Sequence, residues 1–351
     1  MSRKHYRKPI LIFVSFFSIL ILIAGIYGYN IYSRMYSPNV RLENKETVFI
    51  HIPTGSSYSD VVAILVSENV LADTVSFRWV SSRMGYPYSV KPGRYKLTNG
   101  MGNKDLVSIL RAGLQTPVRV TFTGFRTPEQ LAQRISKQLE ADSVEIVAAF
   151  SNEELVNEFG FSTETFIAMF IPNTYEFFWN IDADGFFKRM KREYDAFWNE
   201  ARIEKAKKLS MSKTQVSTLA SIVEEETINR DERPKVAGVY VNRLERGMPL
   251  QADPTIKFAL GDFTIRRILT KHLTVDSPYN TYRNRGLPPG PINAPSISSI
   301  DAVLNYEVHK YLYFCAKADF SGYHSFAKTL TEHNKNAREY QRALNRERIY
   351  K

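Results

Sequence analysis

The chain has 351 residues, of which 44% are hydrophobic and 13% aromatic, and its formal net charge is +11. This composition predicts two or three folded domains and no long disordered tract. The positive charge favours anionic surroundings: a membrane surface, a nucleic acid or an anionic polymer. No zinc finger, RNA-binding signature or basic heptad region supports the nucleic acid. Cys315 is the only cysteine, which excludes an intramolecular disulfide and a thiolate metal cluster.

The N-terminal region predicts a membrane anchor. Residues 10–29 are apolar, and no charged residue occurs between Lys8 and Arg34. Roughly 20 helical residues cross a hydrocarbon core of ~30 Å. A cleaved signal peptide is the alternative, but the run is long and no small-x-small cleavage site ends it. We therefore expect a transmembrane helix over residues 9–32.

The charges before this segment predict its orientation. Four basic residues lie within residues 1–8, namely Arg3, Lys4, Arg7 and Lys8. By the positive-inside rule, residues 1–8 form a cytoplasmic tail and the chain after the helix is extracytoplasmic. We therefore expect a single-pass protein of the cytoplasmic (inner) membrane.

A small α/β module is predicted over residues 37–115. Residues 37–46 are polar and charged, which is typical of a short stalk. The module then has a strand over 47–52, a Pro-Thr-Gly turn and several short helical stretches. This start resembles a LysM-type glycan-binding unit. The domain boundary is expected between Gly113 and Pro117.

The remainder, residues 116–351, is predicted to be one mixed α/β domain. Its expected elements are strands over 117–123, within 170–177, over 311–315 and over 324–326, and helices over 128–139, 143–150, 186–209, 235–246 and 330–345. The predicted fold class of the whole chain is therefore α+β.

A helix over Gln215–Arg230 carries three consecutive glutamates. Its apolar positions recur at spacings of three and four, which indicates one buried stripe. Glu225 points away from this stripe, whereas Glu224 and Glu226 lie on its two flanks, Glu226 closer to the apolar centre. A partly desolvated carboxyl has a raised pKa that suits general acid catalysis. A solvated acidic helix end is the alternative.

Three loops rich in polar side chains, proline and glycine follow this helix. They cover residues 251–255, 277–282 and 286–292. Proline and glycine fix the backbone of such loops, so their polar groups can form the wall of a binding groove. For any one of these loops considered alone, a structural connector explains the sequence as well as a binding wall does.

Several kinds of chemistry are absent from the sequence. It has no Gly-x-Ser-x-Gly elbow, no His-Glu-x-x-His and no complete phosphate-binding loop. Its six histidines are scattered, so no metal and no other cofactor is predicted. Carboxylates with hydroxyl and amide donors remain, and these suit cleavage of glycosidic bonds.

Five motifs together resemble one family. They are Ala220-Ser-Ile-Val-Glu-Glu-Glu-Thr227, Gln251-x-Asp-Pro-Thr255, Tyr279-Asn-Thr-Tyr282, Gly286 to Ile292 and Tyr311-Leu-Tyr-Phe314. In this order they are similar to the endolytic murein transglycosylases, the MltG or YceG-like membrane-anchored lytic transglycosylases. The resemblance covers nearly the whole chain. Asn173 stands where aspartate is usual, so this position is assigned no role. Tyr323 stands where glycine is usual, so the resemblance does not fix the geometry of the hairpin before His324.

The resemblance implies a fold and an activity. The fold comprises a membrane helix, the LysM-like module and a YceG-like catalytic domain with a lysozyme-like glutamate helix. The activity is cleavage of the β-1,4 bond between N-acetylmuramic acid and N-acetylglucosamine inside peptidoglycan strands. The product is a 1,6-anhydro-muramic end, and the implied partners are peptidoglycan synthases (penicillin-binding proteins).

The resemblance also implies site residues. The catalytic glutamate corresponds to Glu224, which first donates a proton and then accepts one. Side chains expected to hold the substrate are Gln251, Asp253, Asn280 and Tyr282, with Glu226 in support. Two other functions remain open: a hydrolytic muramidase that uses Asp253 to position water, and a non-catalytic glycan-binding anchor.

Overall fold

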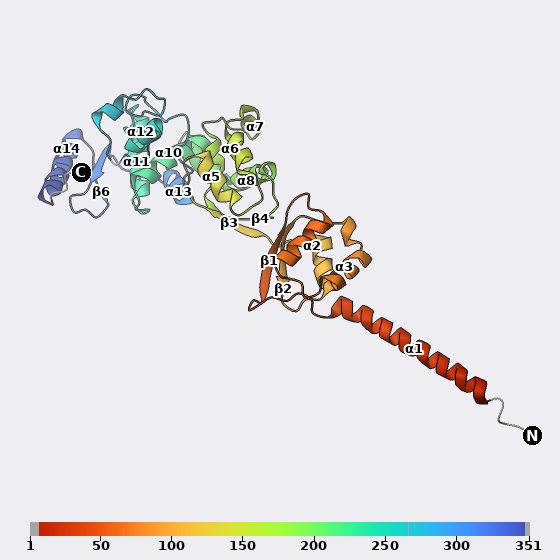
Figure 1. Ribbon diagram of the computed structural model, residues 1–351. Helices are drawn as coiled ribbons and strands as arrows, with labels where there is room; N and C mark the ends of the chain where they lie inside the picture. Colours follow the sequence, from red (N-terminus) through yellow and green to blue (C-terminus); the bar gives the residue numbers. More distant parts are fainter. Residues whose placement is uncertain (1–6, 266, 348–351) are drawn as a thin grey trace, which may run out of the picture. The chain divides into compact units, whose positions relative to one another are not determined.

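The computed structural model describes residues 7–265 and 267–347, so part of the predicted cytoplasmic tail lies outside the described residues. The chain divides into two compact units. The first runs to Arg119 and also includes residues 138–140 and 176–181, whereas the second contains the rest. The division thus falls close to the predicted boundary at Gly113–Pro117, a few residues later in the chain. Figure 1 shows the elements and their labels.

The first unit begins with α1 (Arg7–Tyr36), a single unbroken helix (Figure 1). From Leu11 to Tyr36 it is long and apolar enough to cross a membrane, with a mean hydropathy of 2.5 over its most apolar window and none of that window buried. The predicted apolar helix is therefore present. The helix extends four residues beyond Tyr32, the last residue of the predicted transmembrane span.

A strand–helix–helix–strand unit follows. It consists of β1 (Thr47–Ile52), α2 (Tyr58–Ser67), α3 (Thr74–Arg83) and β2 (Gly93–Thr98), with a 3-10 turn, η1 (Tyr86–Tyr88), before β2 and the helix α4 (Asn103–Ala112) after it. The strands are antiparallel, with Thr47 opposite Thr98. Buried side chains from all of these elements form one core. The described residues of this region thus combine strands and helices around one core, and the predicted module and its likeness to LysM stay predictions.

The segment expected to be a stalk is part of this module. Asn39 and Val40 are 4% and 2% exposed. Isolated bridges pair Pro38 with Gly102 and Val40 with Leu71. The segment has few apolar residues but makes backbone pairs, which a reading of composition does not detect. No free spacer therefore separates α1 from the module.

The second unit starts with an aromatic layer. Its elements are α5 (Pro128–Ser136), α6 (Ser143–Phe150), α7 (Glu153–Glu158), η2 (Phe166–Met169), α8 (Ala183–Phe197) and α9 (Glu200–Lys208). The strands β3 (Val118–Phe122) and β4 (Asn173–Phe177) each belong partly to this unit and partly to the first. Phenylalanines of β3, α6, η2 and α8 are linked by ring contacts, with Phe150 and Phe166 at 5.0 Å between ring centroids. The single helical region predicted over 186–209 is two helices, because Asn199 caps the second one.

The remaining elements surround α10 (Lys213–Glu226). They are α11 (Arg233–Glu245), α12 (Asp253–Leu260), η3 (Thr270–Thr274), α13 (Ile297–Leu304), the hairpin β5 (Tyr313–Ala316) and β6 (His324–Ala327), and α14 (Leu330–Arg346). The hairpin is the predicted one, with Phe314 opposite Phe326. All three sheets of the described chain are two-stranded, so the fold is mixed α/β with helices as its main layers.

Candidate functional site

The helix α10 forms for reasons that are visible in its sequence. Ser212 caps its N-terminus in a capping box with Gln215, each side chain binding the other residue's backbone N–H. Eight consecutive residues, 216–223, are buried. The helix ends at Glu226, because Thr227 has extended backbone angles. Its last turn therefore carries all three glutamates, about 100° apart around the axis.

Glu226 opens into a cavity of about 380 Å³. Its Oε1 accepts a hydrogen bond of 2.7 Å from the hydroxyl of Tyr240, a buried residue of α11. Burial raises the pKa of Glu226 to about 7, and the negative charge of Asp253 adds to this effect, whereas the Tyr240 hydrogen bond opposes it. The carboxyl can therefore both donate and accept a proton near neutral pH.

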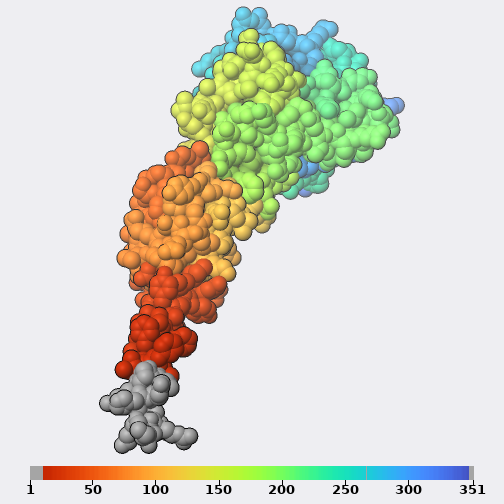
Figure 2. Space-filling model, turned by 90° about the vertical axis from the view of Figure 1, so that its right-hand side faces the viewer, coloured from red at the N-terminus to blue at the C-terminus, as the bar shows by residue number. Residues whose placement is uncertain are grey.

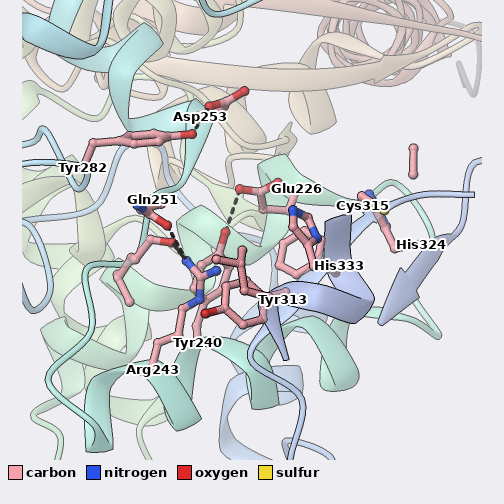
Figure 3. Close-up of a pocket in the computed structure, with 14 residues that line it drawn as sticks. Glu226, Tyr240, Arg243, Gln251, Asp253, Tyr282, Tyr313, Cys315, His324 and His333 are labelled. Atoms are coloured by element: carbon pink, nitrogen blue, oxygen red, sulfur yellow. Dashed lines mark hydrogen bonds between the residues drawn. The ribbon is translucent and has the colours of Figure 1, made fainter. Parts of the chain in front are cut away.

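The cavity is lined by residues of α10, α11, α12, β5, β6 and α14 and of the loops that carry Gln251 and Tyr282 (Figure 3). The Tyr282 hydroxyl donates a hydrogen bond of 2.6 Å to Oδ1 of Asp253, at the first position of α12. Gln251 lies at the same wall, with Oε1 3.5 Å from Nη1 of Arg243. Tyr313 lines another wall, where the Arg243 guanidinium lies 5.2 Å from its ring centroid. The structure thus brings four predicted residues together: Glu226, Gln251, Asp253 and Tyr282.

Glu224 does not line this cavity. Its Oε2 accepts a hydrogen bond of 2.6 Å from the backbone N–H of Ser296, the residue that precedes α13. The buried guanidinium of Arg233 donates to the hydroxyls of Ser296, Ser298 and Ser299 in the same region. Burial lowers the pKa of Arg233, and the carboxylate of Glu224 opposes this effect. Glu224 therefore joins α10 to α13.

Glu225 is engaged on a further side of α10. The Arg126 guanidinium binds both of its oxygens, at 2.7 and 2.6 Å, and Asn293 donates to Oε1 at 2.7 Å. The side chain was expected to point into solvent. Instead it is only 25% exposed, because the loop after β3 carries Arg126 against it.

Asn280 is fully buried and its amide is used within its own loop. Its Nδ2 donates to the carbonyls of Leu273 and Val275, at 2.9 and 2.8 Å. Its Oδ1 accepts from the backbone N–H of Tyr282 at 3.0 Å. Asn280 is absent from the cavity wall and instead fixes the backbone that carries Tyr282.

Other cavity residues were not found by sequence reasoning. Tyr240 and Arg243 lie on α11, His324 on β6 and His333 on α14. The buried carboxylate of Glu232 accepts hydrogen bonds of 2.7 Å from both the backbone N–H and Nδ1 of His324. The spacing of Tyr240 and Arg243, which places both on one face of α11, was the available signal. Nothing local links His324 to Glu232, 92 residues earlier.

A metal site has no support in the described residues, which contain no group of three or more His, Cys, Asp or Glu side chains close enough to bind an ion. His324 and His333 do line the same cavity. However, His324 is bound to Glu232, and His333 stacks on Tyr313 with ring centroids 5.5 Å apart.

The comparison with protein families identifies the chain. Residues 50–339 match the model of the YceG-like family, which is well over half of the sequence. The chain belongs to the YceG-like family. The family predicted from the five motifs is therefore confirmed.

Curated relatives of this YceG-like chain carry one functional name. The endolytic murein transglycosylase of Bacillus subtilis (strain 168) is 32% identical over 329 residues, which cover 89% of this chain and 90% of the relative. The protein of the same name from Streptococcus pneumoniae serotype 2 (strain D39) is 26% identical, over 96% of this chain and 66% of the relative. A crystal structure of a yceG-like protein from Listeria monocytogenes is 31% identical, with a TM-score of 0.55 over 83% of this chain and 99% of that one.

Proposed function

We propose that this YceG-like protein is a membrane-anchored endolytic lytic transglycosylase that cleaves the MurNAc-β-1,4-GlcNAc bond within peptidoglycan strands. The names of its relatives support the reaction class. The single observation that carries the chemistry is Glu226, a carboxyl with a pKa near 7 that opens into a polar cavity. The protein thus has one proton carrier at the place where a sugar can bind.

The proposed reaction uses Glu226 twice. Protonated Glu226 donates to the glycosidic oxygen, so that the bond from muramoyl C1 to this oxygen breaks as an oxocarbenium-like centre develops. The carboxylate then removes the proton from the muramoyl 6-hydroxyl while O6 forms a bond to C1. The anhydro ring closes, the carboxyl is protonated again, and no water is consumed. Tyr240 holds Oε1 throughout, because its own raised pKa keeps the hydroxyl protonated.

This assignment differs from the one that family resemblance implied, which was Glu224. The Oε2 of Glu224 is bound to a backbone N–H, and its side chain does not line the cavity. We therefore propose a positioning role for Glu224, which secures the last turn of α10 on α13. The same turn then presents Glu226 to the substrate.

The other cavity residues have proposed roles that follow from their contacts. Asp253 supplies negative charge opposite the developing cation, and Tyr282 orients its carboxylate. Gln251 offers an amide to sugar hydroxyls at the same wall. Asn280 acts through the backbone of Tyr282. His324, oriented by Glu232, offers its other ring nitrogen to the acetamido or peptide groups of the strand.

The cellular setting is also a proposal. The apolar α1 supports a single-pass anchor in the cytoplasmic membrane, with the catalytic unit on its outer side. Anchoring would limit the enzyme to glycan close to the membrane, where strands are made. Peptidoglycan synthases are then the expected partners, and termination of nascent strands is the expected outcome.

The test is mass spectrometry of uncrosslinked glycan strands incubated with the full chain in detergent. We expect internal fragments with 1,6-anhydro-muramic ends. Glu226→Gln should lower the rate by about 10²–10⁴-fold, the usual worth of general acid–base catalysis. The matched variant Glu224→Gln, which keeps an oxygen for the Ser296 N–H, should keep most of the activity. Loss with Glu224→Gln and retention with Glu226→Gln would return the catalytic role to Glu224.

A hydrolytic muramidase is the second candidate, because Asp253 lies in the same cavity as Glu226 and could position a water molecule. It predicts reducing ends in place of anhydro ends, which the same spectra distinguish by the mass of one water. Reducing ends that disappear with Asp253→Asn would favour this reaction.

A further inference from the structure

The C-terminal end of α1 is built into the first unit. The carbonyl of Arg34 accepts a hydrogen bond of 2.9 Å from Nδ2 of Asn103, a buried residue at the start of α4. A Cβ atom on Gly102 would lie 3.0 Å from the carbonyl oxygen of Tyr36, an unusually tight contact, so glycine favours this close approach. Met35 packs against the module core. The helix and the module therefore form one continuous body (Figure 2).

The length of α1 sets the height of this junction above a membrane. If residues 10–29 cross the hydrocarbon core, the residues from Asn30 to Tyr36 rise about 10 Å beyond it. Each headgroup layer is only about 5–8 Å thick. The module is packed on Arg34 to Tyr36, without a spacer. Arg34, five residues after Tyr29, therefore lies about 8 Å beyond the core, at the outer edge of the headgroup layer, and Tyr36 lies just outside it.

Five residues at this junction form a collar, defined as Arg34, Tyr36, Trp79, Arg83 and Lys104. The guanidinium carbons of Arg34 and Arg83 lie 5.3 and 5.2 Å from the Trp79 ring centroid. The Lys104 Nζ donates to the Tyr36 hydroxyl at 3.1 Å and lies 4.9 Å from its ring centroid. Three cations thus surround two aromatic rings, a composition that suits the membrane interface.

Other residues near the C-terminal end of α1 and on α3 are also suited to the membrane interface. Tyr27, Tyr29 and Tyr32 are 61%, 71% and 62% exposed, which resembles an aromatic belt. Val75, one turn before Trp79 on α3, is 71% exposed. Two carboxylates are near: Asp73 interacts with Arg34 and Asp105 with Lys104. Asp73 caps α3 through the backbone N–H of Val75, and Arg83 has no carboxylate bound to it in the described chain.

We infer that the collar binds phosphate groups of membrane lipids and thereby holds the first unit against the bilayer that α1 crosses. This inference rests on the proposed membrane anchor. Arginine is suited to the role because its planar fork of donors matches phosphate oxygens. The contacts of both guanidinium groups with the Trp79 ring hold these side chains in place, which reduces the side-chain entropy lost on binding.

The experiment uses the full chain in mixed phosphatidylcholine and phosphatidylglycerol vesicles that contain a lipid with a nitroxide on its headgroup. In a Cys315→Ser background, a fluorophore is attached to Val75→Cys, one turn from the collar residue Trp79, or to Ser59→Cys as the matched control. Ser59 lies in the first turn of α2, which follows the C-terminal end of β1 at Ile52, whereas Thr47 is at the N-terminal end of that strand. We expect strong quenching at position 75 and none at position 59.

The combined substitution Arg34→Ala and Arg83→Ala should remove much of the quenching at position 75 while the chain still floats with the vesicles. Equal quenching at both positions, or quenching that the combined variant leaves unchanged, would overturn the inference and leave the anchor intact. Failure of the unsubstituted chain to float with vesicles would overturn the anchor and the inference together.

Discussion

The hydrogen bond from Tyr240 to Glu226 allows one prediction to be worked out in detail. Tyr240→Phe removes the hydroxyl that lies 2.7 Å from Oε1 and changes nothing else in the packing. This bond favours the ionised carboxylate, so its loss raises the pKa of Glu226 further above 7. A hydrogen bond to a charged group is worth about 1.5–3 kcal/mol. At about 1.4 kcal/mol per pH unit, the pKa should rise by about one to two units.

The assay is the pH profile of kcat/KM on uncrosslinked glycan, whose limbs report the pKa values of the free enzyme. The limb on which activity falls as Glu226 loses its proton should move to higher pH by about one to two units in Tyr240→Phe. Tyr279→Phe is the matched control, because Tyr279 is half-buried beside Phe258 and does not line the cavity. A limb that stays in place in Tyr240→Phe, or moves to lower pH, would refute the reasoning.

Three further predictions concern stability, measured by denaturant unfolding. Because the pKa of Glu226 is raised from 4.5 to about 7, the folded state loses stability as pH rises through this range. Above pH 7, Glu226→Gln should therefore have a higher free energy of unfolding than the unsubstituted chain, by at most about 3 kcal/mol. Below pH 4.5 the two free energies of unfolding should be equal. Glu232→Ala should cost about 3 kcal/mol, because it leaves buried donors unpaired. Glu204→Ala, at an exposed ion pair, should leave the unfolding midpoint almost unchanged. Gly290→Ala should cost about 3 kcal/mol, since its Cβ would overlap a backbone carbonyl. Gly286→Ala, at a φ of +84° in open space, should cost about 1–2 kcal/mol. Equal costs for Glu232→Ala and Glu204→Ala, or for the two glycine substitutions, would contradict the contacts described.

The sequence predicted most of the elements because their signals are local. The period of α10 places Glu224 and Glu226 on its flanks, with Glu226 nearer the apolar centre. Residue order alone cannot tell which flank faces a cavity, since the cavity walls come from α11, α12, β5 and α14. The tertiary structure was therefore needed to show that Glu226 faces the cavity. The resemblance to a family had implied Glu224 as the catalytic residue.

The missed features depend on pairs far apart in the chain. Asn39 and Val40 read as part of a stalk until Gly102 and Leu71 pair with this segment. Asn280 was predicted to bind the substrate, but its side-chain amide donates to a backbone carbonyl of its own loop. Polar residues in loops bind either the substrate or their own backbone, and sequence composition is the same in both cases.

The last turn of α10 opposes the electrostatics of its own helix. A helix C-terminus carries a partial negative charge and favours cations, yet this one ends in three glutamates and no basic residue. Isolated from the rest of the protein, the turn would fray. Its helical geometry depends on groups supplied by the rest of the second unit: the Ser296 N–H, the Arg126 guanidinium and the Tyr240 hydroxyl. The carboxyl of Glu226, the proposed proton carrier, therefore reaches its position in the cavity only after the surrounding unit has folded.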